Sequence, residues 1–436
     1  MKRYRQYILY LAVFAALASA LYLLMVFSAA IPNSAIRKNM QNSAKRYMDT
    51  DRYAFSEDGF LKNVTDNHAD QMWLNIGWNM GSGDPFRDAL DTDYYDGESF
   101  GTTAGLYLTV TRGRTANADY SRYWHGTAGL IRILHLFTNI RVIKALCFFC
   151  LLLLFGNTLR VLVRRGHWDL GLCLLASLFW VQAWNLRLSM EYLPCFLICF
   201  GLCPAFLNLE KQGDFFLMLL SIASGTLTAF FDFLTTETVT ILIPLILVMA
   251  VRSRERRLST PLSAAKLLVR CALCWLLAYG GMFLLKWVLV SLATGENHFL
   301  SGLDSAGRRI GGEVTGGQLR KKPGFFMAIA ANLSALFSGS SRTEYRLVIG
   351  MLLCLALLAF LLYRFSQFKG KLRPGTVFIL LLGSLVLLRY GLLANHSYLH
   401  AFFTYRALAS TIFSVLTAVT LNLHTAKSGG RYRKWN

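Results

Sequence analysis

Long apolar runs recur from one end of the chain to the other, and polar residues gather between them. A run of roughly 18–25 apolar residues is long enough to cross the hydrocarbon core of a bilayer as one helix. The sequence therefore predicts an all-α polytopic membrane protein. Ten transmembrane helices are expected, at residues 7–31, 140–163, 168–185, 188–208, 214–233, 236–251, 268–293, 346–364, 374–393 and 406–424.

Basic residues predict the orientation of these helices. Lys and Arg cluster after the second, fourth, sixth, eighth and tenth runs and before the first. Cytoplasmic connections of membrane proteins collect such residues, so both termini are predicted to be cytoplasmic. Residues 425–436 then form a basic cytoplasmic tail. The first run is too long for a signal peptide and has no small-residue cleavage site, so we interpret residues 1–31 as a retained helix.

Two long connections lie on the opposite, extracytoplasmic side. Residues 32–139 far exceed the roughly 12–15 residues of an unstructured loop, which predicts a folded cap over a membrane-embedded pocket. Within them, Ser34–Met48 and Gly126–Leu136 have the amphipathic spacing of interfacial helices. Residues 294–345 form the second connection, and residues 140–293 and 346–424 hold the remaining helices.

The second connection combines a glycine-rich stretch with an apolar one. It contains the glycine-rich Gly307–Gly317, and the apolar spacing of Phe325–Phe337 suits another interfacial helix. We predict that residues 294–345 together form a mobile lid.

The composition agrees with a membrane protein. It argues against nucleic-acid binding and against a metal site built from cysteines. The residues are 55% hydrophobic and 16% charged. The formal charge of +21 lies mostly between the helices, so no nucleic-acid partner is expected. All nine cysteines fall within apolar runs, and no histidine or further cysteine completes a metal-binding set around them.

Acidic residues of the first connection are candidate general bases. Asp66 and Asp70 stand directly before the apolar stretch Met72–Trp78, which predicts a packed helix that holds both acids near the membrane. One fixed carboxylate beside arginines meets the needs of a base acting on a hydroxyl. Glu57 and Asp58 are alternative acids. Solvated surface charge is the competing interpretation for all four.

Polar residues at the outer ends of the helices suggest a phosphate site, because charges there are costly without a partner or ligand. Arginine offers phosphate oxygens a fixed fork of N–H donors. His396 and His400 have a metal-ligand spacing, but no acid flanks them, so a divalent metal is not favoured. Anchoring at the membrane interface is the alternative. The candidate donor-binding residues are Asp232, Arg389, His396, His400, Tyr405 and Arg406.

Tyr123, Trp124 and His125 precede the second predicted helix and combine aromatic faces with hydrogen-bonding groups. Such a mixture can hold a sugar. An aromatic belt at the membrane surface would have the same composition.

Four short motifs resemble those of a known group of proteins. They are DNxxDxxxL at Asp66–Leu74, RYWHG at Arg122–Gly126, FDFLTT at Phe231–Thr236 and NHSYLHAFFTYR at Asn395–Arg406. With the layout of the helices, they resemble the GT-C superfamily of membrane glycosyltransferases, and more narrowly a group of bacterial multi-pass cell-surface proteins similar to glycosyltransferases.

The resemblance implies a GT-C-like fold and a sugar donor carried on a polyprenyl phosphate. One acid of the first connection, Asp66 or Asp70, would be the base of an inverting transfer, with Glu57 and Asp58 also matching the family's pattern. Outer arginines and histidines would hold the lipid phosphate, and no cofactor is needed. The acceptor would be a cell-envelope polysaccharide, teichoic acid or glycolipid, outside the bacterial cytoplasmic membrane.

Two alternative functions stay open, and the positions of the charges bear on each. A polysaccharide polymerase or ligase that uses undecaprenyl-diphosphate-linked glycans would also need outer arginines and a large connection. A flippase or transporter of lipid-linked sugar would instead carry charges or helix breaks near the middle of several spans.

Overall fold

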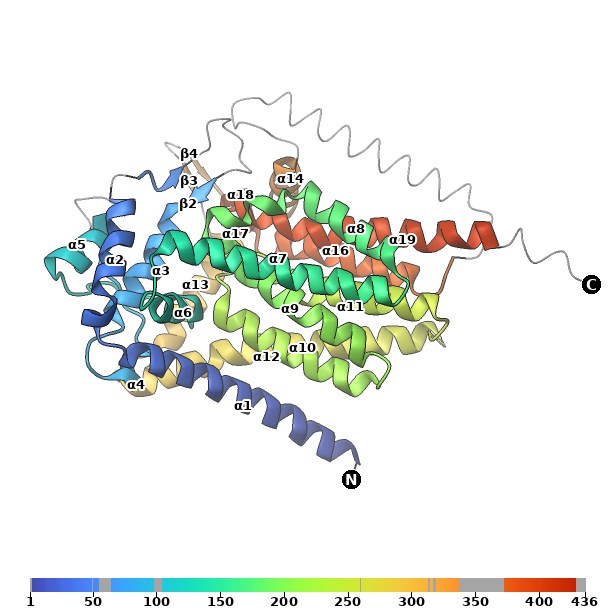
Figure 1. Cartoon of the computed structure of the whole chain (residues 1–436), viewed down its shortest axis with the longest axis horizontal. Coiled ribbons are helices and arrows are strands. Elements are labelled where there is room, and N and C mark those ends of the chain that lie inside the picture. Colours follow the sequence, from blue (N-terminus) through green and yellow to red (C-terminus); the bar gives the residue numbers. More distant parts are fainter. Residues whose placement is uncertain are drawn as a thin grey trace, which may run out of the picture.

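The computed structural model describes residues 2–48, 50–54, 64–97, 104–258, 260–312, 314–316, 319–336 and 372–428. Long helices form a bundle, and shorter helices lie beyond one of its ends (Figure 1). The bundle contains α1 (Lys2–Ala30), α7 (Ile140–Arg164), α8 (Trp168–Trp180), α9 (Pro194–Leu209), α10 (Asp214–Phe231), α11 (Val239–Arg254), α12 (Pro261–Thr294), α16 (Thr376–Leu392) and α19 (Leu408–Ser428).

We call the shorter elements before α7 the cap. They are α2 (Asn33–Tyr47), β1 (Tyr53–Ala54), β2 (Thr65–Asp66), α3 (Asn67–Asn79), α4 (Pro85–Asp88), α5 (Ala104–Arg112) and α6 (Gly126–Leu134). Other short elements are η3 (Ala183–Leu188), η4 (Met190–Tyr192), α13 (His298–Gly311), β3 (Val314–Gly316), β4 (Leu319–Lys321), α14 (Phe325–Ala335), α17 (Ala394–Leu399), α18 (Ala401–Thr404) and η5 (Tyr405–Ala407). Strands β1 and β2 pair antiparallel, as do β3 and β4.

Helix α11 lies at the centre of the bundle. Its sequence is apolar around nearly the whole circumference, which is typical of a helix enclosed by other helices. Residues Val239–Val251 are all buried, and α9, α16 and α19 pack against them. Helices α10 and α12 approach closely because Gly225 has no side chain. A Cβ atom at this position would overlap the carbonyl oxygen of Trp275.

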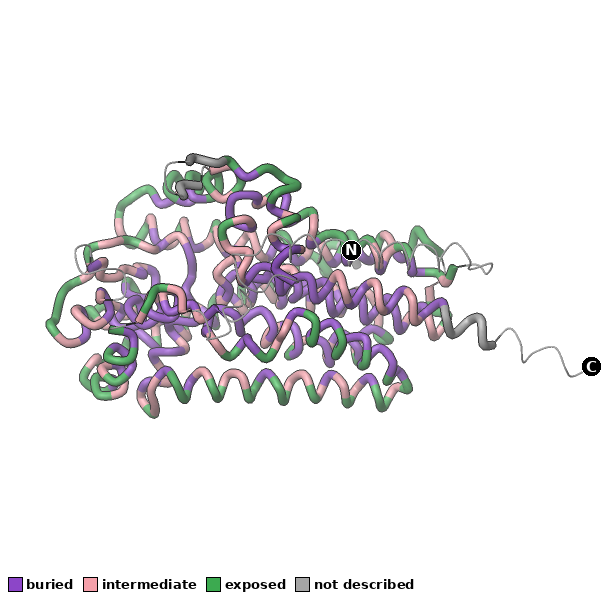
Figure 2. The backbone as a smooth tube through the Cα atoms, turned by 90° about the horizontal axis from the view of Figure 1, so that it is seen from above, coloured by how far each residue is buried: buried purple, intermediate pink, exposed green. Residues whose placement is uncertain are grey.

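Exposed apolar side chains cover the outside of the bundle. Exposed positions recur along the full length of several outer helices (Figure 2). Leu11, Phe149 and Leu277 are each more than half exposed, which suits contact with lipid. Within the described residues, six helices are long and apolar enough to cross a membrane. They are Tyr4–Ala30, Ile140–Arg164, Met190–Leu209, Asp214–Phe231, Pro261–Thr294 and Ala401–Asn422.

Three of the other predicted spans correspond to shorter helices. Helices α8, α11 and α16 have 13, 16 and 17 residues. The predicted span at residues 346–364 lies outside the described residues. The predominantly helical character is therefore confirmed, and six helices have the length and composition of membrane spans. The count of ten spans stays a prediction.

Among the described residues, the basic residues after α7 and α11 lie at the end of the bundle away from the cap. Arg165 donates a hydrogen bond of 2.7 Å to Glu210, which also pairs with Arg252 and Arg257. Arg254 pairs with Asp169 in the same region. The start of α1 and the end of α19 point toward this end as well (Figure 1). Basic residues that occur in alternate connections along the sequence are thus found together at one end of the bundle.

The predicted short helices exist as α2, α6 and α14. The predicted lid at residues 294–345 stays a prediction, and its first part is helical. Helix α13 extends to Gly311 and packs against α12 and α17. The beginning of the glycine-rich stretch is therefore helical, because its residues continue an amphipathic pattern that starts at His298.

Candidate functional site

Asp66 lies where the cap meets the bundle. It ends strand β2, which pairs with β1, and it is the N-cap residue of α3. Its Oδ1 accepts a hydrogen bond of 2.8 Å from the backbone N–H of Ala69. A carboxylate at this place satisfies a free N–H group and interacts favourably with the positive end of the helix dipole. The predicted packed helix is confirmed, with Asp66 fixed at its start.

Asp66 lines a polar cavity of about 190 Å³, which we call the polar pocket. The cap contributes one wall, and the others come from η4, the connection between α10 and α11, α13 and the α17–α18 segment. Its lining residues are Arg52, Tyr53, Asp66, His68, Ala69, Met72, Trp73, Tyr120, Glu191, Phe233, Arg309, His396, His400 and Phe403.

Two carboxyl groups meet in this pocket. Burial raises the pKa of Asp66 to about 6, against the effect of hydrogen bonds from Ala69 and from the carboxyl group of Glu191. Two carboxyls joined by a hydrogen bond share one proton, which leaves a single negative charge on the pair. Both residues line the polar pocket, so the pair places a single negative charge at its wall.

Two arginines bring positive charge to the same cavity. Arg52 precedes β1, and Arg309 lies near the end of α13. Neither forms an ion pair with an acid of the described residues, whereas Arg309 lies over the ring of Tyr123 at 5.4 Å. Arginine forks of this kind can bind phosphate oxygens.

The histidines of the pocket are neutral at pH 7. Burial, reinforced by Arg309, lowers the pKa of His400 to about 4, and burial with Arg52 lowers the pKa of His68 to about 4. Arg309 donates to His396 Nδ1 at 2.9 Å, so the proton of that ring resides on Nε2 and is donated to the carbonyl of Leu234. Positive charge in the pocket consequently comes from the arginines.

An apolar cavity of about 380 Å³ adjoins the polar pocket, and we call it the apolar groove. Arg309 lines both cavities, and the consecutive residues Phe233 and Leu234 line one each. The groove runs along α12 beside Phe283 and Trp287. Together the two volumes fall within the ~300–1,000 Å³ of ligand sites. A ligand with an anionic group at Arg309 can extend an apolar tail into the groove and a polar part into the pocket.

Asp70, the second predicted base, is outside this pocket. Its carboxylate is fully buried and accepts four hydrogen bonds. The donors are Tyr47, Lys144, Ser189 and the backbone N–H of Met190, at 2.8–2.9 Å. A general base needs an oxygen free to take a proton. These contacts use both oxygens, so the structure gives Asp70 a structural position.

The predicted phosphate arginines are also occupied elsewhere. Arg389 is buried and pairs with Glu237, at 2.6 Å from Nε to Oε1. Arg406 is buried against the rings of Tyr192 and Tyr405, at 4.2 and 5.1 Å. Neither guanidinium lines the polar pocket. Of the predicted donor-binding residues, only His396 and His400 do so.

Two other members of that set have structural contacts. The hydroxyl of Tyr405 donates to the carbonyl of Val181 at 3.1 Å. Asp232 accepts hydrogen bonds from the backbone and side chain of Thr235, at 3.1 and 2.5 Å. Burial raises the pKa of Asp232 to about 6, yet its carboxyl group is used to close a turn.

The predicted sugar-binding residues separate in the structure. Tyr123 lines the apolar groove. Trp124 is buried and donates to the carbonyl of Met282 at 2.7 Å. His125 contacts Tyr120 and Phe233 outside both cavities, and burial lowers its pKa to about 3. Trp124 and His125 are packing residues for this reason.

The alternative acids Glu57 and Asp58 lie outside the described residues.

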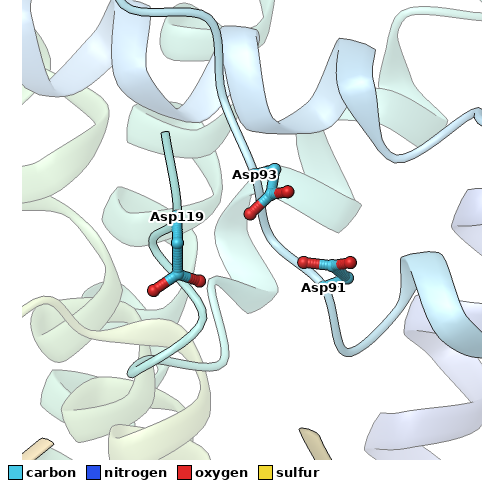
Figure 3. Close-up of side chains that lie close together, drawn as sticks. All are labelled: Asp91, Asp93 and Asp119. Atoms are coloured by element: carbon cyan, nitrogen blue, oxygen red, sulfur yellow. The ribbon is translucent and has the colours of Figure 1, made fainter. Parts of the chain in front are cut away.

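A separate acidic cluster is found in the cap. Oxygens of Asp91, Asp93 and Asp119 lie within 4.8 Å of one another (Figure 3). Burial and the neighbouring Asp91 raise the pKa of Asp93 to about 7, as expected when carboxyls crowd together. The three acids do not line the polar pocket.

Several pocket residues were not found from the sequence. Arg309 stands in the stretch predicted to be a mobile lid, Arg52 in a connection, and His68 between the two predicted acids. Glu191 is notable in the sequence as an acid at the start of an apolar run, but nothing there indicates its contact with Asp66.

Comparison of the chain with family models, curated proteins and solved structures finds no match.

Proposed function

We propose that the protein is a membrane glycosyltransferase that moves a sugar from a polyprenyl-phosphate donor to a cell-envelope acceptor on the extracytoplasmic face. The observation that supports this most is the polar pocket, with its acid pair and two arginines, next to an apolar groove that shares Arg309. A polyprenyl-phosphate sugar has a matching order of parts, with an apolar tail, an anionic phosphate and a polar ring.

In this proposal, each group has a role in the reaction. The acceptor hydroxyl gives its proton to Asp66 while its oxygen forms a bond to the anomeric carbon. The bond from that carbon to the phosphate oxygen breaks, and its electron pair leaves with the phosphate. Arg309 and Arg52 stabilise the charge that develops there. Attack opposite the leaving group inverts the configuration.

Glu191 keeps this base functional. Two ionised carboxylates in contact repel each other, so one of the pair keeps a proton near neutral pH. A proton on Glu191 donates to Asp66 and leaves Asp66 charged. In this proposal, Arg309 and Arg52 bind the donor phosphate, whereas the sequence analysis predicted that Arg389 and Arg406 would bind it.

The test is transfer by the purified protein in proteoliposomes. The donors are undecaprenyl phosphates carrying labelled glucose, galactose or mannose, and the acceptor is a cell-envelope extract. We expect a labelled acceptor and released undecaprenyl phosphate. Asp66→Asn should lower turnover by about 10²–10⁴-fold, the usual effect of losing a general base. Asp304→Asn, a change at an exposed acid of α13, is the matched control.

Three outcomes would contradict the proposal. Full turnover of Asp66→Asn would remove the base from the mechanism. Movement of lipid-linked sugar across the vesicles with no new glycosidic bond would identify a transporter. Turnover only with undecaprenyl-diphosphate-linked glycans would identify a polymerase or ligase.

A further inference from the structure

A second, smaller polar cavity opens beside the polar pocket along the same helix. Its volume is about 40 Å³, and His68 and Met72 line both cavities. Gln71 and Asn75 complete its wall on α3. These four residues are spaced so that they share one face of a helix. We call this space the side cavity.

Gln71 is the unusual residue of the side cavity. Its side chain is 2% exposed, and neither Nε2 nor Oε1 has a hydrogen-bond partner among the described residues. A buried amide without partners is costly, and native proteins rarely keep one unless water or a ligand satisfies it. The amide lies on a polar cavity that shares His68 and Met72 with the polar pocket, so a group of a ligand bound there can supply the missing partners.

The opposite wall of the side cavity is fixed. Asn75 donates to the carbonyl of Tyr95 at 2.9 Å and accepts from its backbone N–H at 3.0 Å. Tyr94 and Asp96, on either side of Tyr95, complete the lining. Asp96 makes this wall unsuitable for a carboxylate or phosphate. The chemistry therefore favours a neutral hydroxyl, to which the Gln71 amide can both donate and accept.

The volume limits the size of the group. One water needs at least about 10–15 Å³ of such space, so the side cavity holds a hydroxymethyl group but no sugar ring. The ring belongs in the polar pocket, because the reacting carbon must lie between Asp66 and Arg309. This step rests on the proposed function.

We propose that the side cavity receives the hydroxymethyl group of the transferred sugar and that Gln71 selects a neutral hexose over the corresponding pentose. A site built to hydrogen-bond a substrate hydroxyl discriminates strongly against the analogue without it, since its own polar groups then stay unpaired. Gln71 would be a specificity-determining residue.

The experiment compares sugars that differ only in this group. Undecaprenyl phosphates carry glucose or xylose, galactose or L-arabinose, and mannose or lyxose, and kcat/KM is measured for each in proteoliposomes. We expect the wild type to prefer the hexose of its favoured pair by about 10–100-fold. Gln71→Leu, similar in size but unable to bond a hydroxyl, should reduce this ratio to near one. Gln71→Ala provides a second variant if leucine impairs folding.

Gln212→Leu, at an exposed glutamine far from α3, is the control and should leave the ratio unchanged. A ratio in both Gln71 variants equal to that of the wild type would overturn the inference, since ordered water would then satisfy the amide. That result would leave the glycosyltransferase proposal standing. Absence of transfer by the wild type with all six donors would instead contradict the proposed function.

Discussion

Replacement of Asp70 by Asn separates a structural role from a catalytic one. The sequence predicts either Asp66 or Asp70 as the general base. In the structure, the buried carboxylate of Asp70 connects three parts of the chain. Tyr47 approaches from α2, Lys144 from α7, and Ser189 with Met190 from the segment before Glu191. Asn keeps the shape of the side chain but turns an NH₂ group toward two donors, the hydroxyl of Tyr47 and the ammonium of Lys144.

The size of the effect follows from the environment of this pair. The Asp70 side chain is fully buried and that of Lys144 is 13% exposed. Removal of one partner from a buried ion pair typically costs about 3–5 kcal/mol. The limited exposure of Lys144 favours the lower end of this range. A domain of about 150–250 residues loses roughly 2–4 °C of Tm per kcal/mol, and a larger one less, so the apparent Tm should fall by several degrees.

Thermal unfolding followed by tryptophan fluorescence in nanodiscs measures the loss. Asp66→Asn should change the apparent Tm much less than Asp70→Asn while lowering turnover by about 10²–10⁴-fold. Lys144→Met in the Asp70→Asn background removes the unpaired ammonium and should recover part of the stability. If Asp70→Asn kept the wild-type Tm and lost transfer, Asp70 would be the base and our assignment of Asp66 would be wrong.

Three further outcomes are expected. Burial raises the pKa of Asp66 to about 6, and the base must be ionised, so kcat/KM should be full well above pH 6 and fall as the pH drops through 6; a flat profile to pH 4.5 would contradict this. Arg309→Lys keeps the charge but loses the fork and should raise the KM for donor more than Arg308→Lys, an adjacent exposed control. An impermeant thiol reagent should label Thr115→Cys and not Gln212→Cys on intact cells, and the reverse would invert the predicted topology.

The helices could be predicted because hydropathy is a property of contiguous residues. Runs of apolar residues predicted α1, α7, α9, α10, α12 and α19, although the starts of α1, α9 and α12 differ from the prediction by five to seven residues. The existence of α3 was predictable for a similar reason, because the apolar stretch Met72–Trp78 lies within it. The capping role of Asp66 is seen only in the structure. Local patterns decide local structure, and these elements need little more.

Most of the site could not be predicted, because it depends on contacts between residues distant in sequence. Arg309 and His396 are 87 positions apart and meet at 2.9 Å. Arg389 and Glu237 are 152 positions apart, and each alone resembles a site residue near the membrane. A charge without a neighbour in the sequence can still have a partner in space, and only the tertiary structure distinguishes the two cases.

The buried pair of Arg389 and Glu237 nevertheless bears on the site through the backbone beside it. The carbonyl oxygen of Leu234 accepts hydrogen bonds from Arg389 and His396, at 3.0 and 2.7 Å. Leu234 has a φ of 61°, a left-handed conformation that costs free energy for a residue with a branched side chain. The two donors offset this cost and fix the direction of the chain. Phe233 consequently faces the polar pocket while Leu234 lines the apolar groove, so the ion pair sets where a ligand's polar part ends and its apolar tail begins.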